Sequence, residues 1–216
     1  MNQLLIPLVL RNIRDYLVNQ KITLDDSDIS NTKDGRIDSA INERLVIDKI
    51  LEGFPIHKPS KARHWFDFSI TTNDVFYPVN IKVSNFGAAD NLNCKLGIYY
   101  ALTGKEPDFS NETAWDNFFH MLANNIQEND KDYYFLVLNK DAPRQILIQG
   151  LKTIGKLSPS GNNLPFQCNW GNNLEPVHRS FDEAKNYLLS CFGKSVKLRA
   201  NIYDEFRAHF PDIITD

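Results

Sequence analysis

The sequence contains few cysteines and lacks a long apolar segment. Three Cys residues occur among 216 residues, an odd number at wide spacing, which excludes both a disulfide framework and a zinc site with paired ligands. The longest apolar run, Leu4 to Leu10, is interrupted by Pro7 and is far shorter than the roughly 20 residues of a membrane span. It also lacks the charged start and cleavage site of a signal peptide. We therefore expect a cytoplasmic protein that makes no contact with a membrane.

Several signatures of common enzyme classes are missing. The sequence has no Gly-rich phosphate-binding loop, no serine nucleophile elbow and no base placed to activate a cysteine. The net charge of -3 argues against a protein that coats nucleic acid non-specifically. A specific DNA enzyme with a locally basic cleft is still compatible with that charge.

The remaining pattern predicts one α/β domain over residues 1–216, with a central mixed β-sheet flanked by helices. We expect helices over residues 2–20, 39–54, 91–103, 111–127, 181–192 and 195–209. We expect strands over residues 65–71, 75–84, 133–138 and 144–151, with polar or irregular chain at 21–38 and 155–179.

The most informative segment is the predicted hairpin from Trp65 to Asn85. Apolar and polar residues alternate along both strands, and Asn73-Asp74 is suited to a tight turn. A hairpin that is symmetric about this turn pairs Phe66 with Ile81 and Phe68 with Val79 on an apolar face. On the opposite face it pairs Asp67 with Asn80 and Trp65 with Lys82. Cβ atoms of such directly opposed residues lie about 4.5–5.5 Å apart.

This polar face has the composition of a site for a hard cation. Asp67 and Asn80 offer the oxygen ligands that Mg²⁺ prefers, and Lys82 would lie beside them. Glu43 is the sole acid on an apolar helical face formed by Ala40, Ile47, Ile50 and Phe54, and could supply a third ligand. The alternative is that the hairpin residues form the solvated face of an antiparallel sheet, and that Glu43 turns to solvent or pairs with an Arg.

An acid on a helix, an Asp on one strand and an acid-x-Lys sequence on the next strand are the arrangement of the PD-(D/E)xK nuclease superfamily, which this sequence resembles. The matching residues are Glu43, Phe66-Asp67 and Asn80-Ile81-Lys82, with Asn80 in the place of the usual acid. The resemblance extends to Leu151–Ile154, to Asn163–Trp170 and to Arg179–Glu183, which are similar to late segments of small type II restriction endonucleases.

The resemblance implies Mg²⁺-dependent hydrolysis of double-stranded DNA at a short, palindromic site by a homodimer. It implies metal ligation by Asp67, Asn80 and the Ile81 carbonyl oxygen, with Glu43 as an outer or second-metal ligand. Lys82 would orient the attacking water. A cognate DNA methyltransferase is expected as a genomic neighbour and not as a physical partner.

Asparagine is abundant, with 23 residues in the chain, and many lie in two segments near the proposed site. Asn and Gln read adenine and Arg reads guanine, so these segments are candidates for base contacts, although Asn is also an ordinary turn former. The candidate DNA-binding residues are Asn85, Asn91, Asn93, Lys95, Gln167, Asn169, Asn172, Asn173 and Arg179.

Two other functions are compatible with the same residues. One is a repair or structure-specific nuclease of the same fold. The other is a DNA-binding or interaction module that has lost catalysis, with Asn80 as the degenerate position.

Overall fold

The computed structural model describes residues 6–20, 22, 35–60 and 64–210. The helices are α1 (Leu8–Asn19), α2 (Gly35–Leu51), α3 (Lys95–Thr103), α4 (Trp115–Asn125) and α5 (Phe181–His209), with 3-10 turns η1 (Leu151–Thr153) and η2 (Trp170–Asn172). The strands are β1 (Phe68–Thr72), β2 (Val75–Ser84), β3 (Ala89–Leu92), β4 (Tyr134–Asn139), β5 (Ala142–Gly150), β6 (Leu157–Ser158) and β7 (Phe166–Asn169).

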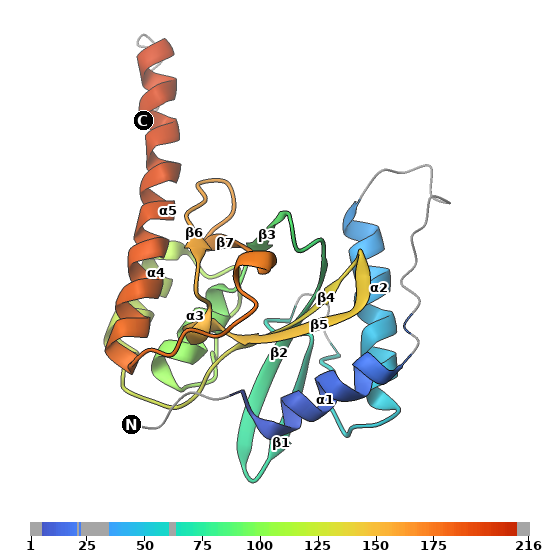
Figure 1. Ribbon diagram of the computed structural model, residues 1–216. Coiled ribbons are helices and arrows are strands. Elements are labelled where there is room, and N and C mark those ends of the chain that lie inside the picture. The colour runs from blue at the N-terminus through green and yellow to red at the C-terminus, as the bar shows by residue number, and fades with distance from the viewer. Residues whose placement is uncertain (1–5, 21, 23–34, 61–63, 211–216) are drawn as a thin grey trace.

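The main sheet is mixed and has the strand order β1-β2-β4-β5. β2 and β4 are parallel, and the two outer pairs are antiparallel. A second, antiparallel sheet has the order β3-β7-β6 and lies beside α5 (Figure 1). The expectation of an α/β protein with a mixed central sheet flanked by helices is therefore confirmed.

Each face of the main sheet carries its own apolar core, because side chains alternate along buried strands. On one face, Val79, Ile81 and Val83 of β2 pack with α1 and α2. On the other face, Phe135 and Val137 of β4 pack with α3, α4, α5 and the small sheet. Asn80 and Lys82 alternate with the first set, so their side chains lie on the second face, beside the small sheet.

The predicted hairpin register is confirmed. Phe68 pairs with Val79, and Asn73 and Asp74 form the turn with positive φ angles of 49° and 60°. The expectation for Phe66 was wrong: it joins the aromatic cluster on the face opposite to Ile81. The chain enters the ladder only at Phe68, which leaves the preceding aromatic residues to pack against Phe76.

The ends of several other helices and strands differ from the expected ones. Residues 89–92 form a strand and not the start of a helix, because they pair with β7. The two expected C-terminal helices are one continuous helix, α5, which no proline interrupts. α2 begins at Gly35, within the segment expected to be a loop, and residues 23–34 of that segment lie outside the described ranges.

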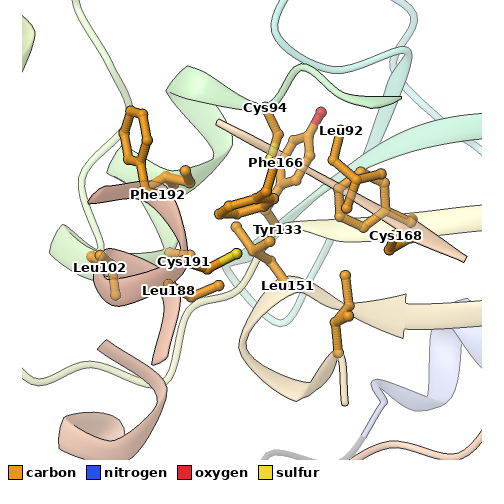
Figure 2. Close-up of a cluster of buried hydrophobic side chains, with 14 of the residues drawn as sticks. Leu92, Cys94, Leu102, Tyr133, Leu151, Phe166, Cys168, Leu188, Cys191 and Phe192 are labelled. Carbon is orange, nitrogen blue, oxygen red and sulfur yellow. The ribbon is translucent and has the colours of Figure 1, made fainter. Parts of the chain in front are cut away.

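The three cysteines are buried in the second core. Figure 2 shows them among side chains from sheet and helix, including Leu92, Phe166, Leu188 and Phe192. Burial raises the pKa of the Cys94 thiol to about 12 and raises the pKa of Cys191 as well. These thiols are thus poor nucleophiles, as expected from the sequence. None of the helices in the described ranges is both long and apolar enough to cross a membrane.

Candidate active site

Asp67 lies directly before β1, where β1 and β2 separate. Its carboxylate accepts a hydrogen bond from the β2 main chain in place of a strand residue. The Asp67 main-chain N–H donates to the Val79 carbonyl oxygen at 2.9 Å, as in the ladder. Two residues further along β2, the Ile81 N–H donates to Asp67 Oδ2 at 2.6 Å. Asn80 Nδ2 donates to the same oxygen at 2.7 Å. The sequence prediction that Asp67 and Asn80 lie together is confirmed.

This arrangement contains three oxygen atoms that the two hydrogen bonds do not use. Both donors contact Oδ2 of Asp67, so its second carboxylate oxygen and the Asn80 carbonyl oxygen are the donor atoms that could bind a cation. The Ile81 carbonyl faces the same side as its N–H, because both groups of a strand residue point toward the same neighbour. Oxygen donors of this kind suit a hard divalent cation.

The charge state of Asp67 is set by opposing effects. Burial raises the pKa of the Asp67 carboxyl, whereas the Ile81 N–H and the Lys82 ammonium lower it. The net shift is upward. A bound cation would act in the same direction as Lys82 and favour the ionised form of this carboxylate.

Lys82 is held by β3 of the small sheet. Its Nζ donates to the Asn91 carbonyl oxygen at 3.1 Å and lies 3.9 Å from Asp90 Oδ1. Both charged side chains are largely buried, with exposed fractions of 22% and 17%. The ammonium is thus placed on the Asp67 face of β2 by groups from a different sheet.

Asp90 is a functional candidate that reasoning from the sequence missed. Its Oδ2 accepts a hydrogen bond of 2.8 Å from Nε1 of Trp170, which is completely buried. This bond fixes the carboxylate beside Lys82. The signal in the sequence is weak, because Asp90 lies in a four-residue strand whose partner β7 is about 80 residues away.

Glu43 lies on α2, a helix that packs on the main sheet. It is half-buried on α2, whose buried residues Val46, Ile47 and Ile50 pack on the face of the main sheet opposite to Lys82. Within the described ranges, no three or more His, Cys, Asp or Glu side chains are grouped so that they could hold a metal ion. Ligation by Glu43 stays a prediction.

Two of the candidate base-reading residues lie next to Lys82. Gln167 on β7 is paired with Asn91 on β3, and its Nε2 donates to Asn91 Oδ1 at 2.5 Å. The main chain of Asn91 is the acceptor for Lys82. Asn93 follows at the end of β3 and is exposed. This part of the small sheet therefore connects possible DNA contacts directly to the candidate catalytic lysine.

The two asparagine-rich loops, far apart in the sequence, meet around Gly87. Asn85 Oδ1 accepts from the Gly87 N–H, and Asn85 Nδ2 donates to Asp141. Asn169 Nδ2 donates to the Gly87 carbonyl oxygen at 2.8 Å, and its Oδ1 accepts from the Asn172 N–H at 3.2 Å. These side chains stabilise the loops, so turn formation accounts for much of the asparagine here.

Three of the predicted DNA-binding side chains make hydrogen bonds to other parts of the protein itself. Lys95 donates to the Asn111 and Thr113 carbonyl oxygens and lies 4.3 Å from the Trp115 ring centroid. Asn173 is buried and bridges Lys156 and Asn169 through its amide. Arg179 donates to the carbonyl oxygens of Lys152, Ile154 and Gly155 and stacks on Tyr187. Their contacts favour a structural role because each polar group already has a partner in its own chain.

Comparison with known proteins finds no family model and no curated protein sequence that matches this chain. The site is therefore interpreted from its own geometry and from the motif resemblance.

Proposed function

We propose that this protein is a sequence-specific, Mg²⁺-dependent endonuclease, a type II restriction endonuclease with the PD-(D/E)xK fold. The single observation that carries the proposal is the arrangement of Asp67, Asn80 and Ile81 at the point where β1 and β2 separate, with Lys82 next along β2. The mixed sheet flanked by helices is compatible with that fold.

Asp67, Asn80 and the Ile81 carbonyl oxygen would hold the cation. One carboxylate with neutral oxygen donors fits Mg²⁺, which commonly keeps several waters and few protein ligands. When bound, Mg²⁺ supplies Lewis-acid stabilisation of the scissile phosphate and a more acidic bound water. The protein contributes the carboxylate position, which is fixed by the hydrogen bonds from Asn80 and Ile81.

Lys82 would orient the attacking water and stabilise negative charge that develops on the phosphate. Asp90 and the Asn91 carbonyl oxygen hold its ammonium before substrate binds, which reduces the reorganisation needed in the reaction. Asp90 would thus act as a positioning residue for Lys82.

Double-stranded DNA would be read by the edge of the small sheet near the active site. Asn91 and Gln167 are the best-placed base-reading candidates because Asn91 lies on β3, which holds Lys82, and Gln167 is hydrogen-bonded to Asn91 from the neighbouring strand β7. A palindromic recognition site would require a homodimer, with one active site for each DNA strand.

Digestion of phage DNA with Mg²⁺ tests the proposal against its alternatives. A restriction endonuclease yields discrete fragments whose ends map to one short sequence. Selective cleavage of branched or damaged duplexes would instead indicate a structure-specific nuclease. Specific DNA binding without cleavage in Mg²⁺ or Mn²⁺ would indicate a module that has lost catalysis.

A further inference from the structure

The small sheet has one face in the core and one face outside it. Leu92 of β3 and Phe166 of β7 are completely buried in the core. Because side chains alternate along a strand, Asn91 and Gln167 lie on the outward face. These two residues are cross-strand partners, and Ser158 of β6 pairs with Gln167 on its other side. The outward face therefore carries a row of uncharged polar side chains that runs across all three strands.

This outward face is continuous with the proposed active site. β3 is the edge strand of the small sheet, and the Asn91 carbonyl oxygen accepts a hydrogen bond of 3.1 Å from Lys82 Nζ. The side chain on the outward face and the carbonyl oxygen that holds Lys82 thus belong to the same residue. The major groove of B-DNA is wide enough to admit two paired strands. A duplex on this face would therefore lie beside the candidate catalytic lysine.

The side chains of Gln167 and Asn91 form one hydrogen-bonded unit. Gln167 Nε2 donates to Asn91 Oδ1 at 2.5 Å, which fixes the direction of both amide groups. Within the described ranges, the two side-chain amides make no other hydrogen bond. Gln167 therefore keeps one N–H and its Oε1 for a base, and the Asn91 amide keeps both of its N–H groups.

The groups that Gln167 keeps match the major-groove edge of adenine. Adenine offers the N7 acceptor and an N6–H donor, and a Gln amide can bind both at once. Guanine is read by Arg or Lys, and cytosine by Asp or Glu. No charged residue occupies an outward position of β3 or β7: these positions are Ala89, Asn91, Gln167 and Asn169. Ala89 is exposed and offers the apolar contact that suits a thymine methyl group.

We propose that this face enters the major groove and that Gln167, held by Asn91, reads an adenine of the recognition site. The inference rests on the proposed nuclease function and narrows its substrate to DNA with an A·T pair at that position. In a duplex, a methyl group on adenine N6 takes the place of the hydrogen that Gln167 Oε1 would accept. DNA methylated at this position is then not a substrate, and the methyltransferase expected as a genomic neighbour belongs to the class that modifies adenine N6.

The first test is digestion of phage DNA that a non-specific methyltransferase has modified at N6 of adenine. The full chain with Mg²⁺ is expected to cut the unmodified DNA into discrete fragments and to leave the modified DNA intact. Cleavage of both samples at equal rates would overturn this inference and leave the proposed nuclease function standing. The absence of discrete fragments from both samples would contradict the nuclease function and this inference together.

The second test changes single atoms in a synthetic duplex that contains the recognition site, with binding measured in Ca²⁺. N6-methyladenine or 7-deazaadenine at the position read by Gln167 should weaken binding by the wild type about 10-fold or more, as expected for a bidentate contact. Gln167→Ala should bind the unmodified and modified duplexes equally. Asn124→Ala removes an exposed amide on α4 and should behave as the wild type.

Circular dichroism checks that both variants are folded, and the comparison of duplexes with the wild type needs no variant. Wild-type binding that no modified adenine weakens would overturn the proposal. The same holds if Gln167→Ala keeps the full sensitivity of the wild type to both modified bases, since another residue would then read the adenine.

Discussion

At the scale of single residues, the Asp67 carboxylate has two roles, and each role uses a different oxygen atom. It satisfies the Ile81 N–H and Asn80 amide left by the end of β1, and it is the proposed carboxylate ligand that contacts both residues. Its pKa is raised by burial, so a cation would stabilise both its charge and the local fold.

Asp67→Asn should therefore abolish cleavage and greatly weaken divalent-cation binding, since only neutral oxygen donors remain at the hairpin. Calorimetric titration with Mg²⁺, or with Ca²⁺ in the presence of DNA, measures the loss. Asp116→Asn is a suitable control because Asp116 is exposed on α4, outside the proposed site. An unchanged metal requirement in Asp67→Asn would show that the cation binds elsewhere.

Substitution of Gln167 should weaken recognition of the DNA sequence, whereas substitution of Asn169 should weaken the stability of the fold. Gln167→Ala should lower discrimination between cognate and scrambled duplexes by about 1–3 kcal/mol if Gln167 makes a bidentate contact with adenine. Asn169→Ala should instead lower the free energy of unfolding by about 1 kcal/mol, because Asn169 joins the two loops through Gly87 and Asn172.

Competition binding in Ca²⁺ over a salt series, combined with urea unfolding, separates these two outcomes. Neither substitution removes a charge, so the salt dependence should not change. If Asn169→Ala loses discrimination and keeps its stability, then the loop and not the strand reads the site.

At the scale of elements, the close approach of α3 to the main sheet helps to position Asp67. A Cβ atom at Gly97 would lie 2.7 Å from the Tyr133 ring, so only glycine permits this packing. The Tyr133 hydroxyl donates to the Trp65 carbonyl oxygen at 2.7 Å, two residues before Asp67. Tyr133 thus contacts α3 through its ring and the segment that carries Asp67 through its hydroxyl.

Gly97→Ala should lower the free energy of unfolding by about 1–3 kcal/mol through overpacking. Gly193→Ala is the matched control: nothing lies within 4 Å of its added Cβ atom, and alanine should stabilise the helix by about 0.5–1 kcal/mol. Thermal or urea unfolding measures both changes. Equal, small effects at the two glycines would mean that α3 does not pack as described.

Asp132 connects the start of β4 to η1, since its carboxylate accepts from the Tyr133 and Lys152 N–H groups. Burial raises the pKa of Asp132 from 3.8 to about 6. The folded state therefore holds its proton more tightly than the unfolded state, and the contribution of Asp132 to stability falls as pH rises from about 4 to about 6.

The difference in unfolding free energy between wild type and Asp132→Asn should reflect that loss. The unfolding free energy of the wild type, minus that of Asp132→Asn, should fall by up to roughly 3 kcal/mol as the pH rises from about 4 to about 6. Above about pH 6 this difference should stay constant. Urea unfolding at several pH values measures the difference. A constant difference over the whole range would show that the pKa of Asp132 is the same in both states.

The elements that the sequence predicted well are those with local signals. Alternation and the Asn73-Asp74 turn predicted the hairpin and hence the meeting of Asp67 with Asn80. Ser180 and Glu183 predicted the start of α5 and form the expected capping box. The strands β3 and β7 were missed because they are short, polar and paired across a long sequence separation. Asp90 was missed with them.

At the scale of the whole molecule, the proposed site depends on the contact between two sheets. The main sheet supplies Asp67, Asn80 and Lys82, whereas the small sheet supplies Asp90 and the Asn91 carbonyl oxygen that hold Lys82. No alternation or spacing in the sequence indicates this contact, because it depends on tertiary packing. The proposed catalytic residues therefore lie on the main sheet, and the proposed base-reading residues lie on the small sheet that packs against it.

The most direct test of this account is single-turnover cleavage of a duplex that contains the recognition site, comparing wild type with Lys82→Ala. Lys185→Ala is the matched control, because Lys185 on α5 has a similar exposed fraction of 27% and also pairs with an aspartate, Asp182. We predict that Lys82→Ala lowers the rate by about 100-fold or more, the usual cost of removing such electrostatic stabilisation, and still binds the site specifically in Ca²⁺. Cleavage by Lys82→Ala at the rate of Lys185→Ala and wild type would contradict the assignment of this site.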